Sequence, residues 1–146
     1  MLSDQSSFDV GVPPSDSELS KPLAEEGYAF MGAVFEVHRV LGGGLLEEIY
    51  QESLEIELSL RGIPFTAKRE LIVHYKTFQL QKRYVPDFHV FDRIVAEIKS
   101  CRQLSIDHEC QLLNYMRITR QPVGYLVNFG PLQKAEWKRF VISEFI

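Results

Sequence analysis

The sequence predicts one mixed α/β (α+β) domain, in which a mixed sheet is flanked by helices. Apolar residues recur at helical spacing early in the chain and again over residues 106–118, whereas the segments between and after them have strand character. The order of helices, antiparallel strands, helix and strand suits a mixed sheet with helices against it. At 146 residues and 45% hydrophobic content, the chain is long enough for one core.

Two helices are expected at the start of the domain. Apolar side chains follow helical spacing over residues 23–41, and Gly42-Gly43-Gly44 ends this helix because glycine enters left-handed conformations freely. A phosphate-binding loop is not expected there, since no Gly-Lys-Ser/Thr follows and the acids Glu47 and Glu48 begin the next helix. That second helix stops at Arg61-Gly62. Its expected apolar face consists of Leu46, Ile49, Ser53, Ile56 and Leu60.

Strand-like segments fill the middle of the chain, and short polar breaks at Lys76-Thr77 and Asp92-Arg93 indicate hairpins. Residues 106–118 form the third expected helix, with Leu112, Leu113 and Met116 as its apolar stripe. A buried strand and a last strand follow it. The expected strands cover residues 63–65, 71–75, 78–80, 84–91, 94–99, 122–129 and 137–142.

The first twenty residues differ in composition from the rest. They are rich in Ser, Asp and Pro and carry few large apolar side chains, so we expect residues 1–20 to be a flexible leader and residues 21–146 to be the single domain. They lack the features of a signal peptide, and no stretch approaches eighteen consecutive apolar residues. A cytoplasmic protein without a membrane partner is expected. Cys101 and Cys110 are expected to be ordinary reduced thiols.

The net charge of −4 is unevenly distributed. Residues 1–57 hold 12 acidic and 2 basic side chains, whereas residues 58–146 hold 8 acidic and 14 basic ones. A basic second half suits a ligand with a phosphate backbone, although an ordinary solvated surface produces the same division. The charge gives modest support to nucleic acid as the partner. Separately from the charge, we expect DNA rather than RNA.

A candidate catalytic site lies in the two segments Pro86-Asp87 and Glu97-Ile98-Lys99. A surface hairpin with alternating charges matches this spacing by accident, but Glu97 lies in an apolar run where a buried, unpaired carboxylate is costly. The acids Asp87 and Glu97, with the Ile98 carbonyl, would hold a hard divalent cation such as Mg²⁺. The cation would activate a water and neutralise charge on a phosphate, and Lys99 would orient that water or stabilise the transition state.

The candidate site requires a particular pairing register in the hairpin that carries Asp87 and Glu97. Residues opposite each other in an antiparallel pair share a face, so Asp87 joins Glu97 and Lys99 only if its partner is odd-numbered. An odd loop, such as residues 92–94, or a bulge satisfies this condition. A regular two-residue turn at Asp92-Arg93 would place Asp87 opposite Ile98, on the wrong face.

Several motifs in order resemble one protein family. Residues 44–50 spell G-x-x-E-x-x-Y and follow Val37-His38-Arg39. Pro86-Asp87, Glu97-Ile98-Lys99, residues 111–115 (QLLNY) and residues 127–130 (VNFG) come after them. Over roughly residues 27–146, the chain resembles the GxxExxY family of the PD-(D/E)xK nuclease superfamily.

This resemblance implies a restriction-endonuclease-like core and assigns roles to six side chains. Asp87 and Glu97 resemble the metal-binding acids and Lys99 the catalytic lysine. Glu47 resembles the helix-borne acid that many members direct toward the metal-activated water. Gln111 and Tyr115, one helical turn apart, resemble the Q-x-x-x-Y pair of some nuclease branches.

Each role has a structural alternative. Glu47 would also stabilise the start of its helix, and Tyr50 would pack at the edge of the core. Gln111 and Tyr115 form an ordinary surface pair in the alternative interpretation, and His89, two residues after Asp87, is more often structural than a ligand. The leading hypothesis is a Mg²⁺- or Mn²⁺-dependent nuclease, as a homodimer or within a larger complex. The alternative is a non-catalytic module that binds nucleic acid or protein.

Overall fold

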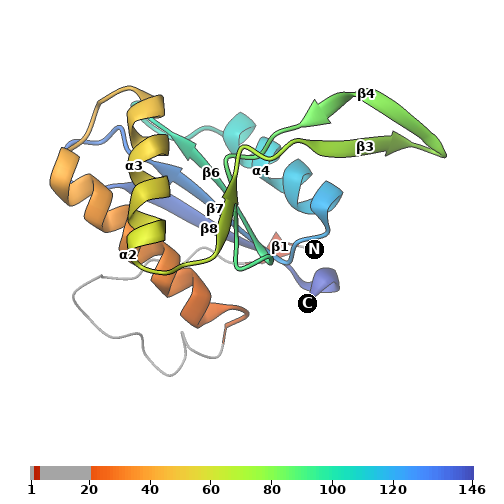
Figure 1. Cartoon of the computed structure of the whole chain (residues 1–146), viewed down its shortest axis with the longest axis horizontal. Coiled ribbons are helices and arrows are strands. Elements are labelled where there is room, and N and C mark those ends of the chain that lie inside the picture. Colours follow the sequence, from red (N-terminus) through yellow and green to blue (C-terminus); the bar gives the residue numbers. More distant parts are fainter. Residues whose placement is uncertain (1, 4–20) are drawn as a thin grey trace.

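The computed structural model describes residues 2–3 and 21–146 (Figure 1). Three helices, eight strands and a short 3₁₀ turn are found in these residues. The helices are α2 (Ala24–Leu41), α3 (Glu47–Leu60) and α4 (Ile106–Thr119), and the 3₁₀ turn is η1 (Ser143–Phe145). The strands are β1 (Leu2–Ser3), β2 (Phe65–Ala67), β3 (Leu71–Tyr75), β4 (Phe78–Tyr84), β5 (Phe88–Val90), β6 (Ile94–Lys99), β7 (Val123–Asn128) and β8 (Glu136–Ile142).

The main sheet has six strands in the order β1-β8-β7-β6-β5-β2. Strands β6 and β7 are parallel and are joined through α4, because a parallel pair needs a crossover, whereas the other neighbours are antiparallel. Strands β3 and β4 form a separate two-stranded sheet that projects from the body in Figure 1. The mixed sheet flanked by helices, predicted from the sequence, is confirmed.

Helices cover both faces of the main sheet. On one face, α2 and α3 bury Phe30, Val34 and Leu54 against the alternate β6 residues Ala96 and Ile98. On the other face, α4 buries Leu112, Leu113 and Met116, the apolar stripe predicted for it, against a cluster that includes Val95 and Leu126. Strand β6 is therefore buried from both sides along nearly its whole length, which makes a charged residue within it exceptional.

The prediction for the apolar face of α3 is wrong. Leu46, Ile49, Ile56 and Leu60 are exposed and Ser53 is half-buried, and the buried face instead consists of Tyr50, Gln51, Leu54 and Leu58. Both sets follow helical spacing, so spacing alone does not choose between them. The contacts of Tyr50 determine which face is buried. Its hydroxyl donates to the Gly42 carbonyl at 2.5 Å, and its ring stacks on Phe129 at 4.4 Å between centroids. This anchor sets the rotation of the helix.

Several strand boundaries also differ from the prediction, and β4 extends to Tyr84 instead of ending at residue 80. The strand expected at residues 84–91 is interrupted, because Tyr84 ends β4 and β5 begins only at Phe88. Pro86 lies in the gap, where its missing N–H prevents a continuous ladder. The strand expected at residues 63–65 lies instead at Phe65–Ala67.

The expected leader falls largely outside the described residues, of which only Leu2–Ser3 belong to it, as the edge strand β1 beside β8. Cys101 and Cys110 are free thiols. No helix among the described residues is long and apolar enough to cross a membrane. The cytoplasmic location stays a prediction.

Candidate active site

The β5–β6 hairpin has the pairing register that the candidate site requires. Phe88 pairs with Ala96 and Val90 with Ile94, so the register continues to place Asp87 opposite Glu97. The connecting loop is Phe91-Asp92-Arg93, a three-residue loop that begins one residue before the predicted loop at residues 92–94. Phe91 and Asp92 adopt left-handed φ angles of 55° and 57°. The two acids therefore meet on the same face.

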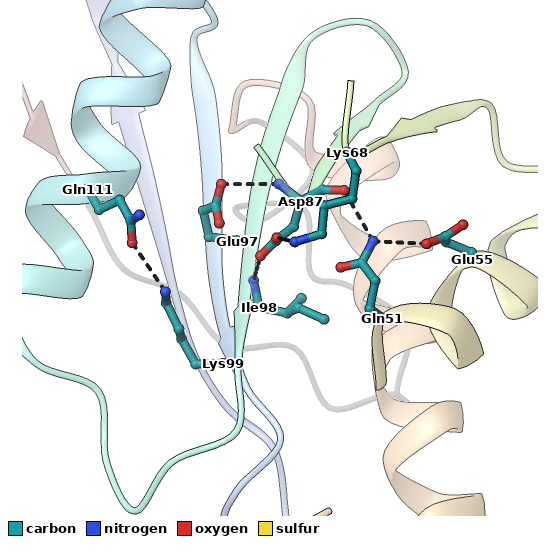
Figure 2. A network of polar contacts seen from close by, with 8 residues as sticks. All are labelled: Gln51, Glu55, Lys68, Asp87, Glu97, Ile98, Lys99 and Gln111. Atoms are coloured by element: carbon teal, nitrogen blue, oxygen red, sulfur yellow. Dashed lines mark hydrogen bonds and ion pairs between the residues drawn. The ribbon is translucent and has the colours of Figure 1, made fainter. Parts of the chain in front are cut away.

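Asp87 and Glu97 are both buried, with only 4% and 3% of their surface exposed. The Asp87 N–H donates to Glu97 Oε1 at 3.2 Å, and the Ile98 N–H donates to Asp87 Oδ2 at 2.8 Å (Figure 2). Burial and then the negative charge of Asp87 raise the pKa of Glu97 to about 9. Two carboxylates this close and this buried do not readily ionise together, so the raised pKa favours the protonated form of Glu97 in the metal-free protein.

Lys68 supplies one cation to this pair, and nothing local in the sequence predicted it. Its ammonium forms an ion pair with Asp87 Oδ1, and its backbone N–H donates to the Asp87 carbonyl at 3.1 Å. Burial lowers the pKa of Lys68, but the hydrogen bond and charge of Asp87 outweigh burial and raise it overall. The pairing of β2 with β5, Ala67 opposite Phe88, brings Lys68 beside Asp87. Only knowledge of that long-range pairing reveals it.

Lys99 lies on β6 two residues after Glu97 but points toward α4. Its ammonium donates to Gln111 Oε1 at 3.2 Å, as Figure 2 shows. Tyr115, one turn further along α4, is buried, and burial followed by the negative charge of Glu97 raises its pKa. The structure thus brings Lys99 into direct contact with Gln111, and places Tyr115 within electrostatic reach of Glu97.

Glu47 approaches the site from the first turn of α3. Burial raises the pKa of Glu47, the negative charge of Asp87 raises it further, and Lys99 and Lys68 oppose the rise. Among the described residues Glu47 makes no direct hydrogen bond to either buried acid. It lines a hollow of about 310 Å³ together with Glu48, Gln51, Glu52, Glu55 and Lys68. Glu47 is therefore a neighbour of the acid pair rather than part of it.

Gln51 is the second site residue that the sequence did not reveal. Its Nε2 donates to the Asp87 carbonyl at 3.4 Å and to Glu55 Oε2 at 3.0 Å. Its buried Oε1 has no hydrogen-bond partner within the described part of the chain. An unpartnered buried oxygen is costly, so this amide marks where an additional donor or ion would be accommodated.

Tyr50 and His89 lie outside the acid cluster. Besides its contacts with Gly42 and Phe129, the Tyr50 hydroxyl accepts from the Leu45 N–H at 3.1 Å, so Tyr50 holds the glycine turn in place. His89 is half-buried on β5, and burial followed by the charge of Arg69 lowers its pKa. It lines a different hollow, with Arg69 and Asp92. The structural interpretation fits both residues.

The chemistry of the donors fits a hard divalent cation. No three His, Cys, Asp or Glu side chains lie close enough to share an ion anywhere in residues 2–3 and 21–146. Mg²⁺, however, commonly takes one or two carboxylates and completes its shell with water and phosphate oxygens. Within a strand, the N–H and C=O of one residue face the same edge, so the Ile98 carbonyl faces the edge at which its N–H meets Asp87. Asp87, Glu97 and Ile98 offer oxygen ligands there.

Two comparisons with known proteins found a similarity. SSO0001, known from a crystal structure, is similar to the chain with a TM-score of 0.53 and 20% identity, over 64% of this chain and 48% of SSO0001. The chain thus spans about half the length of that protein, and the likeness concerns the fold alone. No curated protein matches the sequence significantly. A model of the PD-(D/E)XK nuclease superfamily matches residues 24–140, which include every residue of the site. The chain belongs to the PD-(D/E)XK nuclease superfamily.

Proposed function

We propose that the protein hydrolyses phosphodiester bonds of nucleic acid, DNA in preference to RNA, with Mg²⁺ or Mn²⁺ as cofactor. The observation that carries this proposal is the buried pair of Asp87 and Glu97, with Lys99 on the same strand as Glu97. Such a pair is unfavourable in a metal-free core at neutral pH, because burial and the charge of Asp87 disfavour the ionised form of Glu97. Its chemistry is that of a site for a cation.

Asp87, Glu97 and the Ile98 carbonyl would hold the cation. A divalent ion there would activate the attacking water and neutralise the negative charge that develops on the phosphate. An ion held there would favour the ionised form of Glu97, whose proton would pass to solvent, because the charge of the ion would outweigh the effect of burial on this carboxyl. Lys68 would compete with such an ion for Asp87 Oδ1, because its ammonium already pairs with that oxygen.

Lys99 acts on the phosphate. Its ammonium is held by Gln111, a neutral acceptor, rather than by an acid, so its charge remains available to a substrate oxygen. Gln111 and Tyr115 would position this lysine and the scissile phosphate from the α4 side. Glu47 would orient the attacking water from the α3 side, as the helix-borne acid that it resembles does in many members of the superfamily.

Two finer assignments belong to the same proposal. Membership of the GxxExxY branch rests on the motif at residues 44–50, whose glycine turn and Tyr50 are joined by hydrogen bonds. Assembly as a homodimer or with other proteins is proposed because a domain of this size offers a small surface for gripping nucleic acid.

The test is a titration of Mg²⁺ and Mn²⁺ into the protein and its Glu97→Ala variant. Melting temperature reports ion binding, and labelled single-stranded and duplex DNA and RNA report cleavage. We expect either ion to raise the melting temperature of the unmodified protein by mass action and to support cleavage, and both effects to vanish in the variant. If ions leave the melting curve unchanged and no substrate is cut, the proposed function is wrong.

The second candidate is a non-catalytic binding module. The ion pair between Lys68 and Asp87 favours it, because this contact neutralises the acid without any metal. Replacement of Lys68 by Met separates the two candidates. A nuclease should bind its ion more tightly without the competing lysine, whereas a module that uses Lys68 as a structural cation should lose stability and gain no affinity for metal.

A further inference from the structure

We propose that the hairpin of β3 and β4 is an arm that binds single-stranded DNA and leads it to the acid pair. This β3–β4 arm consists of residues 69–84. The role of the arm in guiding a substrate rests on the proposed function. Its binding of nucleic acid does not, because none of its residues belongs to the acid pair.

The position of the arm ties it to the site. Lys68, which binds Asp87, immediately precedes the arm, and Asp87 follows its last residue, Tyr84, by three positions. Between these anchors the two strands pair only with each other, as a sheet of their own. Figure 1 shows this sheet extending away from the helices and the main sheet. A ligand held along the arm is thereby directed toward Asp87.

The base of the arm packs against α4. The rings of Tyr84 and Tyr115 meet edge to face, 4.9 Å between centroids and 82° between planes. Beside this contact lies an open groove of about 450 Å³, lined by Tyr84, Asp107, His108, Cys110, Gln111, Asn114 and Tyr115. Gln111 also binds Lys99, so the groove borders the candidate active site. A strand of nucleic acid on the arm would pass through this groove.

The tip of the arm carries two aromatic rings in solvent. Tyr75 and Phe78 are paired across the hairpin and share a face, with 61% and 70% of their surfaces exposed. Lys76 lies in the turn between them, and its ammonium is 5.5 Å from the centroid of the Tyr75 ring. An isolated two-stranded hairpin is at best marginally stable, and a cross-strand pair of aromatic rings adds only modestly to its stability. Rings placed side by side in this way form a stacking surface.

The charge of the arm suits a phosphate backbone. Residues 69–84 hold four basic side chains and one acidic one. Arg83 donates to the carbonyls of Leu80 at 2.6 Å and Gln81 at 3.3 Å, which fixes its guanidinium near the irregular part of the ladder. The Lys82 ammonium has no hydrogen bond or ion pair to any other described residue. Its exposed charge is free to meet a phosphate.

Aromatic rings with nearby lysines are what single strands require. Bases stack on aromatic side chains, each of which contributes independently of sequence, while lysines track the backbone. A duplex hides the faces of its bases, so the exposed rings of Tyr75 and Phe78 would find no partner in one. The combination therefore favours a single strand over a duplex.

The test compares the full-length protein with a Tyr75→Ala/Phe78→Ala double variant. Fluorescence anisotropy measures binding to a labelled single strand of about 16 nucleotides, to the matching duplex and to RNA of the same sequence, without divalent ions. An Ile56→Ala/Leu60→Ala variant, which removes two exposed apolar side chains from α3, is the matched control. We expect the arm variant to bind the DNA single strand at least tenfold more weakly and the control to bind normally.

A Lys82→Ala variant tests the electrostatic contribution. Its loss should reduce the slope of log affinity against log salt by about 0.7, the effect of one phosphate contact on a single strand. A Phe78→Trp variant covers the case in which the double variant folds poorly. Its indole should be quenched when the single strand is added, whereas Trp137 provides the background measured in the unmodified protein.

The outcomes separate the arm from the catalytic proposal. Cleavage with normal single-strand binding by the arm variants overturns the arm and leaves the nuclease. Arm-dependent binding without cleavage in any divalent ion supports the arm and counts against the nuclease. Preference for duplex, preference for RNA, or no binding by the unmodified protein overturns the arm as a site for single-stranded DNA.

Discussion

Two hairpins flank Asp87 and differ in almost every property. The β5–β6 hairpin has a three-residue loop and is buried on both faces, whereas the β3–β4 hairpin has a two-residue turn and stands largely in solvent. In the buried hairpin the exceptional residues are the two carboxyls, and in the exposed one they are the two aromatic rings. In each place, the residues that fit their surroundings least are the candidates for function.

Inserting a glycine into each hairpin loop tests this difference most severely. An insertion between Asp92 and Arg93 makes the odd loop even, so restoring the acid pair would require β5 to turn its buried residues outward. We expect loss of cleavage and of cooperative folding in this variant, measured by DNA cutting and thermal melting. The same insertion between Lys76 and Thr77 should leave the melting temperature within about 3 °C. Equal damage from both insertions would contradict the comparison.

Asp87→Asn tests the acid with the least possible change of shape. The amide oxygen still accepts from the Ile98 N–H, but the negative charge that attracts the cation and pairs with Lys68 is gone. We expect cleavage to fall by about a thousandfold, within the range known for loss of a charge-stabilising group. Asp92→Asn, on the exposed loop of the same hairpin, is the matched control and should cut normally.

The buried β5–β6 hairpin was predicted from the sequence more accurately than the residues that surround it were. Strand β6 was predicted with its observed bounds, 94–99, because its β-branched and apolar residues are interrupted only by Glu97. The condition that Asp87 oppose an odd-numbered residue was correct as well. These features depend on neighbours within about a dozen residues, where periodicity carries the information.

The missed features depend on contacts that are distant in sequence. Lys68 reaches Asp87 only because β2 pairs with β5, and Gln51 reaches the Asp87 carbonyl only because Tyr50 sets the rotation of α3. Helical spacing allowed two faces for α3, and the wrong one was chosen. Periodicity thus predicts that a face exists but does not say what it packs against.

The Glu97→Gln variant should differ from the unmodified protein in how its melting temperature depends on pH. The pKa of Glu97 is raised to about 9, so its contribution to stability is fully present below its unfolded pKa and is lost as the pH rises toward 9. The metal-free variant should therefore melt several degrees higher than the unmodified protein at pH 8 and equally at pH 4. Glu52→Gln, on the exposed side of α3, should show no such difference. An identical pH dependence in both proteins would remove the argument for a strained acid pair.

Lys68→Met should change metal binding by a smaller amount. Without the competing ammonium, Mg²⁺ affinity measured by calorimetry should increase about fivefold, which corresponds to the roughly 1 kcal/mol of a half-exposed ion pair. Lys82→Met removes the same charge from the arm and should leave the affinity unchanged. A decrease in affinity would mean that Lys68 helps to shape the site instead of competing for it.

Glu47→Gln is expected to have the smallest effect on stability, and its direction distinguishes two roles. A first-turn acid that only stabilises the helix start should cost about 0.3 to 1 kcal/mol when neutralised. The pKa of Glu47, however, is raised by burial and by Asp87, so its negative charge is disfavoured where it lies. We therefore expect Glu47→Gln to retain or slightly increase the free energy of unfolding at pH 7, measured by urea denaturation, while cleavage falls.

Glu48→Gln, in the same turn but exposed, should show the reverse: a small loss of stability and normal cleavage. If both variants lose stability alike and cut alike, Glu47 serves only its helix, and the site consists of Asp87, Glu97 and Lys99 without an acid from α3.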